Sequence, residues 1–141
     1  MIERLKKRAD FLNTAKGRRW VTPNFTLQAK QRVEHFNKKH GVDDASLRAL
    51  VNQASRIGYT VTKKAGNSVQ RNRIRRKLKS AIFTLAPQLS EANLAQPDYD
   101  YVLIGRDTIL RLDFIILKNE LRSAFEGVHR ARSSAKATRN A

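Results

Sequence analysis

Cysteine is absent from this chain of 141 residues, and long apolar runs are absent as well. Without cysteine the chain has no disulfides, thiolate zinc sites or cysteine nucleophiles. Its longest apolar runs are YVLI (101–104) and FIIL (114–117), far short of the about 18 residues that suggest a membrane-spanning helix. The basic start, residues 1–11, is not followed by the apolar segment of a signal peptide. We therefore expect a cytoplasmic protein with no membrane partner.

Acidic residues are also scarce: 12 Asp and Glu face 29 Lys and Arg, which gives a formal net charge of +17. Residues 45–90 contain no acid at all but hold ten Lys and Arg. In so short a chain this charge repels itself and costs stability unless a polyanion neutralises it. Nucleic acid is the first partner that this composition suggests, and an anionic membrane surface is the second.

The hydrophobic pattern predicts one domain over residues 1–130 and a disordered basic tail over residues 131–141. Ile2, Leu5, Ala9 and Leu12 have helical spacing and predict a helix that ends near Gly17. We expect a short edge strand before Pro23 and a longer one after it, in which Phe25, Leu27 and Ala29 alternate with polar residues and form an apolar face. Further strands are expected over 56–64 and 101–105. Asp113 is expected to cap a last helix, in which Leu117, Leu121, Phe125 and Val128 share a face. The polar residues 37–52 are read as an excursion between strands.

The most informative segment is KKAGNSVQRNRIRRKLKSA, residues 63–81. Asn67 has the position of an N-cap and Gln70 that of its capping-box partner, so a helix should begin at Ser68 and run to about Leu85, closed by Pro87. Its apolar stripe comprises Ile74, Leu78, Ala81, Ile82 and Leu85. The rest of its circumference carries Arg71, Arg73, Arg75, Arg76, Lys77 and Lys79. The narrow stripe is needed to hold the helix on a sheet, which argues against a membrane-surface helix.

Residues with catalytic or metal-binding chemistry are few and poorly spaced. His35, His40 and His129 are expected at the surface, and Asp98 and Asp100 are explained as turn residues at the start of a strand. No catalytic set is suggested by spacing, so we expect no independent active site. Phe11, in a basic segment, is the best candidate for an aromatic platform on which an unpaired base stacks.

These residues resemble a known family. TKKAGNSVQRNRIRRKLKSA is similar to the signature of the bacterial ribonuclease P protein component, in which a KK-GNAV-RNR-KR stretch runs from a strand into a basic helix. RLKKRADF resembles that family's first helix, PNFTLQA its long strand and DYVLIGR its final strand.

The resemblance implies an α+β fold, an αβββαβα two-layer sandwich of the ribosomal protein S5 domain 2-like type. It also implies a left-handed βαβ crossover between the strands of Tyr59 and Val102, although right-handed crossovers are the general rule. The function implied is that of an accessory subunit of an endoribonuclease. The protein assists a catalytic RNA that removes the 5′ leader of precursor tRNA, with Mg²⁺ bound mainly by that RNA and no obligate protein partner.

Two groups of site residues follow from the resemblance. The residues expected to bind the RNA subunit are Lys64, Asn67, Arg71, Asn72, Arg73, Arg75, Arg76 and Lys79. The residues expected to bind the leader are Phe11, Gln28, Lys30 and Lys63. Ala15 stands where many members of the family have a second aromatic, and Gln28 where some have Tyr. Two alternative functions remain open at this point: a ribosomal or other structural RNA-binding protein, and a self-sufficient nuclease.

Overall fold

The computed structural model describes residues 2–31, 55–92, 94–96 and 99–130, and the two predictions on residues 37–52 and 131–141 lie outside them. Five strands form one sheet in the order β1-β4-β5-β3-β2. The strands are β1 (Ile2–Arg4), β2 (Arg18–Val21), β3 (Phe25–Gln31), β4 (Ser55–Val61) and β5 (Tyr99–Gly105). The helices are α1 (Arg8–Thr14), α4 (Ser68–Glu91) and α5 (Phe114–Arg130), with 3₁₀ turns η1 (Lys63–Ala65) and η2 (Asp107–Arg111).

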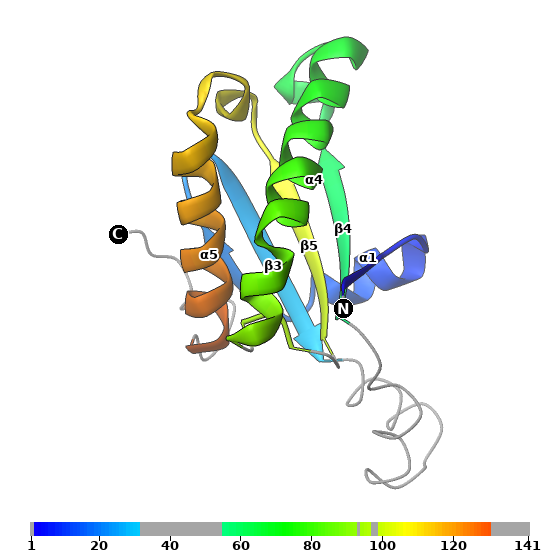
Figure 1. Ribbon diagram of the computed structural model, residues 1–141. Helices are drawn as coiled ribbons and strands as arrows, with labels where there is room; N and C mark the ends of the chain where they lie inside the picture. The colour runs from blue at the N-terminus through cyan, green and yellow to red at the C-terminus, as the bar shows by residue number, and fades with distance from the viewer. Residues whose placement is uncertain (1, 32–54, 93, 97–98, 131–141) are drawn as a thin grey trace, which may run out of the picture.

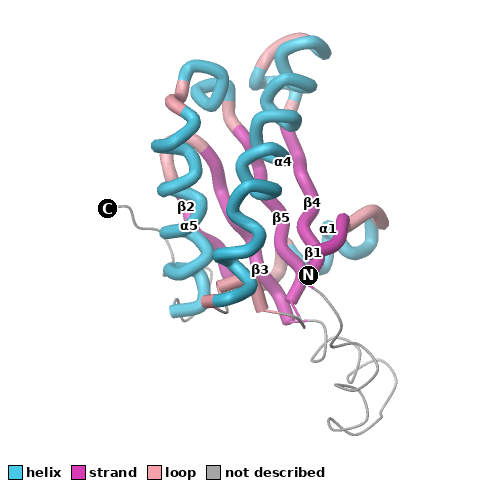
Figure 2. Tube along the Cα trace, viewed as in Figure 1, coloured by secondary structure: helices cyan, strands magenta, loops and turns pink. Residues whose placement is uncertain are grey.

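The arrangement confirms the expected sandwich. Helices α4 and α5 lie side by side on one face of the sheet, and α1 lies on the opposite face (Figures 1 and 2). Strand β5 is antiparallel to β3 and parallel to β4. Figure 1 views the sheet from the side of α4, with β4 to the right of β5 and both pointing up, so the β4–α4–β5 crossover is left-handed. None of the helices among the described residues is long and apolar enough to span a bilayer.

The core lies between the sheet and the helix pair. Alternate residues of β3 (Phe25, Leu27 and Ala29) are fully buried, as the alternating pattern predicted. Both helices contribute the stripes that their spacing predicted, and all of these side chains are buried: Ile74, Leu78, Ala81, Ile82 and Leu85 from α4, and Leu117, Leu121, Phe125 and Val128 from α5. Asp113 caps α5 as expected, because its Oδ1 accepts a hydrogen bond from the Ile115 amide at 2.8 Å.

The first helix was predicted too long. Residues Ile2–Arg4 form a strand that pairs in parallel with β4, and only Arg8–Thr14 are helical. Leu5 is buried between the two elements, whereas Leu12, assigned to the same apolar face, is 54% exposed. The physical reason is that β1 satisfies the backbone groups of β4, which would otherwise be an open sheet edge.

Pro87 does not close α4, which continues to Glu91 with the proline inside it. Proline removes one helical N–H, which normally breaks or kinks a helix. Here Leu89 extends the buried stripe by one more turn and is fully buried. Packing of Leu89 therefore outweighs the local preference to stop.

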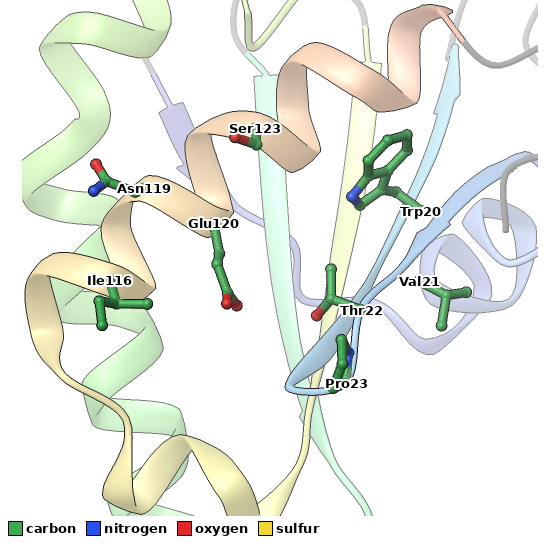
Figure 3. A pocket seen from close by; sticks show the side chains of 8 residues that line it. All are labelled: Trp20, Val21, Thr22, Pro23, Ile116, Asn119, Glu120 and Ser123. Carbon is green, nitrogen blue, oxygen red and sulfur yellow. The ribbon is translucent and has the colours of Figure 1, made fainter. Parts of the chain in front are cut away.

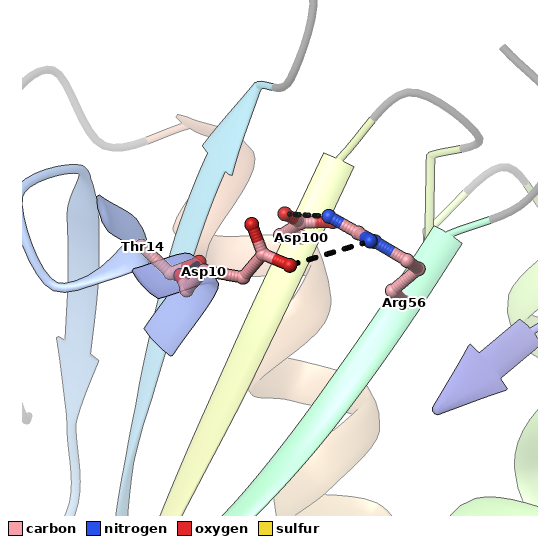
Figure 4. A network of polar contacts seen from close by, with 4 residues as sticks. All are labelled: Asp10, Thr14, Arg56 and Asp100. Carbon is pink, nitrogen blue, oxygen red and sulfur yellow. Dashed lines mark hydrogen bonds and ion pairs between the residues drawn. The ribbon is translucent and has the colours of Figure 1, made fainter. Parts of the chain in front are cut away.

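Two polar residues were also misplaced by the sequence patterns. Asp100 lies within β5 and is 2% exposed; its carboxylate accepts hydrogen bonds from Nε and Nη2 of Arg56 at 2.8 and 2.7 Å. Figure 4 shows the Arg56 guanidinium directed toward both Asp100 and Asp10, and the Asp10 carboxylate is 3.5 Å from Nη1. The hydrogen bonds to Asp100 raise the pKa of Arg56. His129 is half-buried in α5, with Nε2 2.7 Å from the Tyr101 hydroxyl.

Candidate nucleic-acid interface

The cationic helix α4 begins at a fully formed cap. Asn67 Oδ1 accepts a hydrogen bond from the Gln70 amide, and the Asn67 amide donates to Gln70 Oε1, both at 2.9 Å. Gly66 precedes them with φ of 140°, and a Cβ there would lie 2.3 Å from Gln70 Oε1. The glycine is therefore required, and the predicted capping box is confirmed. The cap uses one oxygen of Asn67 and leaves its amide nitrogen for another partner.

The exterior of α4 presents the predicted cations to solvent. Asn72, Arg73 and Arg76 are exposed, and Arg75 and Lys79 are half-buried along one side. The first acid of the helix is its last residue, Glu91. An uninterrupted cationic surface of this kind attracts phosphates, and the attraction weakens as salt rises.

Two cations of α4 also hold the fold together. Arg71 Nε donates to the Gly66 carbonyl at 3.2 Å, which fixes the start of the helix. Lys77 Nζ donates to the carbonyl oxygens of Ile109, at 2.8 Å, and Leu112. Lys77 thus ties α4 to η2, a structural role that its expected place on the cationic exterior of the helix did not predict.

A cationic hollow of about 260 Å³ opens where α4, α1 and β1 meet, and we call it the Phe11 hollow. The Phe11 ring lies against the backbone of β4, since a Cβ on Gly58 would come within 2.4 Å of its Cζ. Glycine at position 58 is thus what lets this aromatic ring approach the sheet. The hollow is lined by Arg4, Leu5, Lys6, Phe11, Tyr59, Arg75 and Lys79.

Tyr59 of β4 is the second aromatic residue that lines the Phe11 hollow. Lys79 Nζ lies 5.7 Å from the centroid of the Tyr59 ring, a cation–π distance. Burial raises the pKa of Tyr59 to about 12, so its hydroxyl stays protonated at neutral pH. The Phe11 hollow thus combines two aromatic rings with four basic side chains.

The structure brings together only part of the two predicted groups. Phe11, predicted to bind the leader, shares its hollow with Arg75 and Lys79, predicted to bind the RNA subunit. Gln28 is 7% exposed and Lys30 is half-buried, and neither lines this hollow. Their role in leader binding stays a prediction.

Lys63 and Lys64 are exposed on η1, at the other end of β4. Lys64 lines a separate hollow of about 430 Å³ together with Arg106 and Asp107. Sequence reasoning missed Arg106, and it missed Arg4, Lys6 and Tyr59 in the Phe11 hollow. Only their basic or aromatic character could have drawn attention to them, because the strand pairings that place them join distant parts of the chain.

A hollow of different character lies between β2 and α5, with a volume of about 320 Å³. Figure 3 shows Glu120 of α5 pointing toward the turn after β2, and its carboxylate accepts a hydrogen bond from Asn24 at 2.9 Å. The described residues that line it include Trp20 and Ile116 but no Lys or Arg. It is therefore poorly suited to a polyanion. Among the described residues, no group of three His, Cys, Asp or Glu side chains is placed to hold a metal ion.

Comparisons with known proteins agree with this geometry. The family model described as Ribonuclease P matches residues 2–129. The ribonuclease P protein component of Paramagnetospirillum magneticum is 40% identical over 128 residues, covering 90% of this chain and 83% of that protein. The Brucella suis protein of the same name is 37% identical over 135 residues, covering 96% of this chain and 86% of that protein.

Solved structures show the same fold. The RNase P protein from Thermotoga maritima is 21% identical, with a TM-score of 0.58, and the match covers 93% of this chain and 99% of that one. The Staphylococcus aureus RNase P protein is 22% identical, with a TM-score of 0.57, covering 87% of this chain and 92% of that one. On the family match and these relatives, the chain belongs to the ribonuclease P protein family.

Proposed function

We propose that this chain binds the catalytic RNA of ribonuclease P through the exterior of α4 and holds the 5′ leader of precursor tRNA in the Phe11 hollow. Membership of the family supports an RNA subunit as the partner. The observation that supports leader binding is the Phe11 hollow, where an aromatic ring lies beside Arg75 and Lys79. Unpaired bases stack on aromatic rings while cations contact the adjoining phosphates.

The role of the protein is to position RNA and to neutralise its charge. Two RNA molecules that approach each other repel through their phosphates, and a chain of net charge +17 reduces that repulsion. The Mg²⁺ that supports hydrolysis is bound mainly by the RNA, since phosphate oxygens are suitable ligands and the cationic α4 repels a divalent cation. The RNA subunit carries out the hydrolysis. The absence of cysteine fits a cytoplasmic location.

Reconstitution separates this function from its two rivals. The full chain is added to precursor tRNA with and without the cognate catalytic RNA, at low magnesium. We expect no cleavage by protein alone and a strong stimulation of the RNA. Cleavage without RNA would establish a self-sufficient nuclease, and a lack of stimulation would favour a structural RNA-binding protein. The family match already favours the proposed function over both rival functions.

Leader binding has its own test, with precursor tRNA and mature tRNA as paired ligands of the reconstituted enzyme. Phe11→Leu keeps an apolar side chain against Gly58 but removes the stacking ring. It should weaken binding of the precursor about 5-fold or more and leave mature tRNA unchanged. Leu12→Ala, an exposed neighbour on the same helix, is the matched control and should change neither. Equal losses for both ligands would refute leader binding at Phe11.

A further inference from the structure

Phe83 is a large aromatic side chain of α4 that the fold does not use. It is 83% exposed, while the adjacent Ile82 is 3% exposed and belongs to the core. Phe83 stands at the rim of a hollow of about 250 Å³ between α4 and β1. We call it the Phe83 hollow, and its walls include Ile2, Arg4, Tyr59, Lys79 and Ile82.

The Phe83 hollow continues the cationic surface of α4. Arg4, Tyr59 and Lys79 line both this hollow and the Phe11 hollow, so the two meet at these residues. Positions 75, 79 and 83 are separated by four residues each and therefore lie along one side of the helix. A strand of RNA that follows Arg75 and Lys79 along α4 arrives at Phe83.

The chemistry of the hollow fits a nucleotide. An exposed phenyl ring offers a flat apolar face on which any base can stack. Arg4 and Lys79 supply positive charge from the two opposite walls, and Glu3 is the acid among the lining residues. A ligand with a flat aromatic part and a single negative charge close to it matches this arrangement.

We propose that the Phe83 hollow binds an unpaired nucleotide of the catalytic RNA, with the base on Phe83 and its phosphate against Lys79 and Arg4. The proposal rests on the proposed function, because it extends the surface of α4 assigned to that RNA. The catalytic RNA is favoured over the leader because Phe83 lies on α4, the helix whose exterior is assigned to that RNA, and because the Phe11 ring does not line the Phe83 hollow. Phe11, assigned to the leader, comes instead from α1 on the other face of the sheet.

Equilibrium binding of the full chain to the cognate catalytic RNA, without substrate, tests the proposal. Phe83→Ala should lower the affinity about 5- to 100-fold, the effect of losing one stacked base. Phe83→Leu should lose nearly as much, because it keeps apolar area but no aromatic face, and Phe83→Trp should retain the affinity. Ile115→Ala is the matched control, since Ile115 is 64% exposed on α5, and it should have no effect. Thermal unfolding should be unchanged in all four variants.

Salt dependence distinguishes stacking from charge. Phe83→Ala should reduce the affinity by the same factor at every salt concentration and leave the log–log slope unaltered. Lys79→Ala should make that slope shallower by up to about 0.9. Chemical probing of the RNA should show one unpaired base that the native protein protects and the Phe83→Ala variant does not.

Several results would overturn the proposal. The first is that Phe83→Ala binds the catalytic RNA with unchanged affinity. The second is that Phe83→Ala weakens only the binding of substrate that carries a leader. The third is that Phe83→Ala abolishes self-association of the protein, measured by sedimentation, while its RNA affinity stays intact. The proposed function fails separately. If Arg73→Ala with Arg76→Ala weakens RNA binding and Phe83→Ala does not, only the Phe83 hollow is refuted. If neither variant changes RNA binding, the assignment of α4 to the catalytic RNA fails as well.

Discussion

Helices α4 and α5 perform the same structural task with different exteriors. They lie side by side on one face of the sheet, and each buries a stripe of apolar side chains (Figure 1). Helix α4 carries six Lys and Arg before its first acid, whereas α5 mixes two Glu with three Lys and Arg. Packing on the sheet therefore does not require a cationic exterior. The charge of α4 is explained by a partner outside the fold, since α5 packs on the same face of the sheet with an exterior of mixed charge.

The largest expected effect tests the feature that the two helices share. Leu78 of α4 and Leu121 of α5 are both fully buried. Leu78→Ala and Leu121→Ala should each lower the free energy of unfolding by about 2–5 kcal/mol, measured by denaturant titration. A negligible cost at Leu78 would mean that α4 is held to the sheet by something other than its apolar stripe.

The next effect concerns a cation of α4 that serves the fold. Lys77→Met removes the charged hydrogen bonds to the Ile109 and Leu112 carbonyls and should cost about 2–3 kcal/mol of stability. The salt dependence of RNA binding should stay unchanged. Lys118→Met on α5, which removes a cation over the Phe114 ring, should cost less than about 1 kcal/mol. A shallower salt slope in Lys77→Met would place Lys77 among the phosphate contacts instead.

Substitution of the exposed cations of α4 should weaken RNA binding and leave stability unchanged, the reverse of the effect expected for Lys77→Met. Arg73→Ala combined with Arg76→Ala should leave stability within about 0.5 kcal/mol. It should lower affinity for the catalytic RNA about 10-fold or more and make the log–log salt slope shallower by up to about 2. Arg122→Ala with Arg130→Ala removes two exposed charges of α5 as the control. Equal losses for both pairs would indicate a general charge effect and would remove the distinction between the helices.

The effect that is smallest at neutral pH concerns the Tyr59 ring beneath Lys79. Burial raises the pKa of Tyr59 to about 12 from a value near 10 in an unfolded chain, so the folded state binds this proton more tightly. The stability that results is present below pH 10 and is lost as the pH rises toward 12. In Tyr59→Phe the decline of stability between these pH values should be less steep. Identical profiles would show that the Tyr59 hydroxyl is hydrated in the folded protein.

The parts of the fold that were predicted correctly depend on neighbouring residues. The capping box of Asn67 and Gln70 lies within four residues, and the stripe from Ile74 to Leu85 repeats with the period of one helix. The alternation in β3 has the same local character. Such patterns can be recognised in the sequence because helix and strand geometry alone decides which side chains share a face.

The errors arose where a distant partner decides the structure. Ile2–Arg4 form a strand because they pair with the edge of β4. Asp100 is a buried member of an ion pair because register places Arg56 opposite it. The same limitation applies to the site: local pattern singled out Phe11 and the arginines of α4, and the family resemblance gave them roles, but Arg4 joins them only through the pairing of β1.

The small strand β1 has a consequence for binding as well as for the fold. It is three residues long, lies at the edge of the sheet and is anchored by the buried Leu5, yet its Arg4 lines both hollows. Short edge segments open locally at a lower free energy than the whole domain. A ligand that binds only the closed edge must raise that opening free energy by its own binding free energy. Hydrogen exchange at the amides of β1 would then slow as more of the protein binds RNA. By reciprocity, closing of the β1 edge strengthens RNA binding by the same free energy with which the RNA stabilises the closed edge.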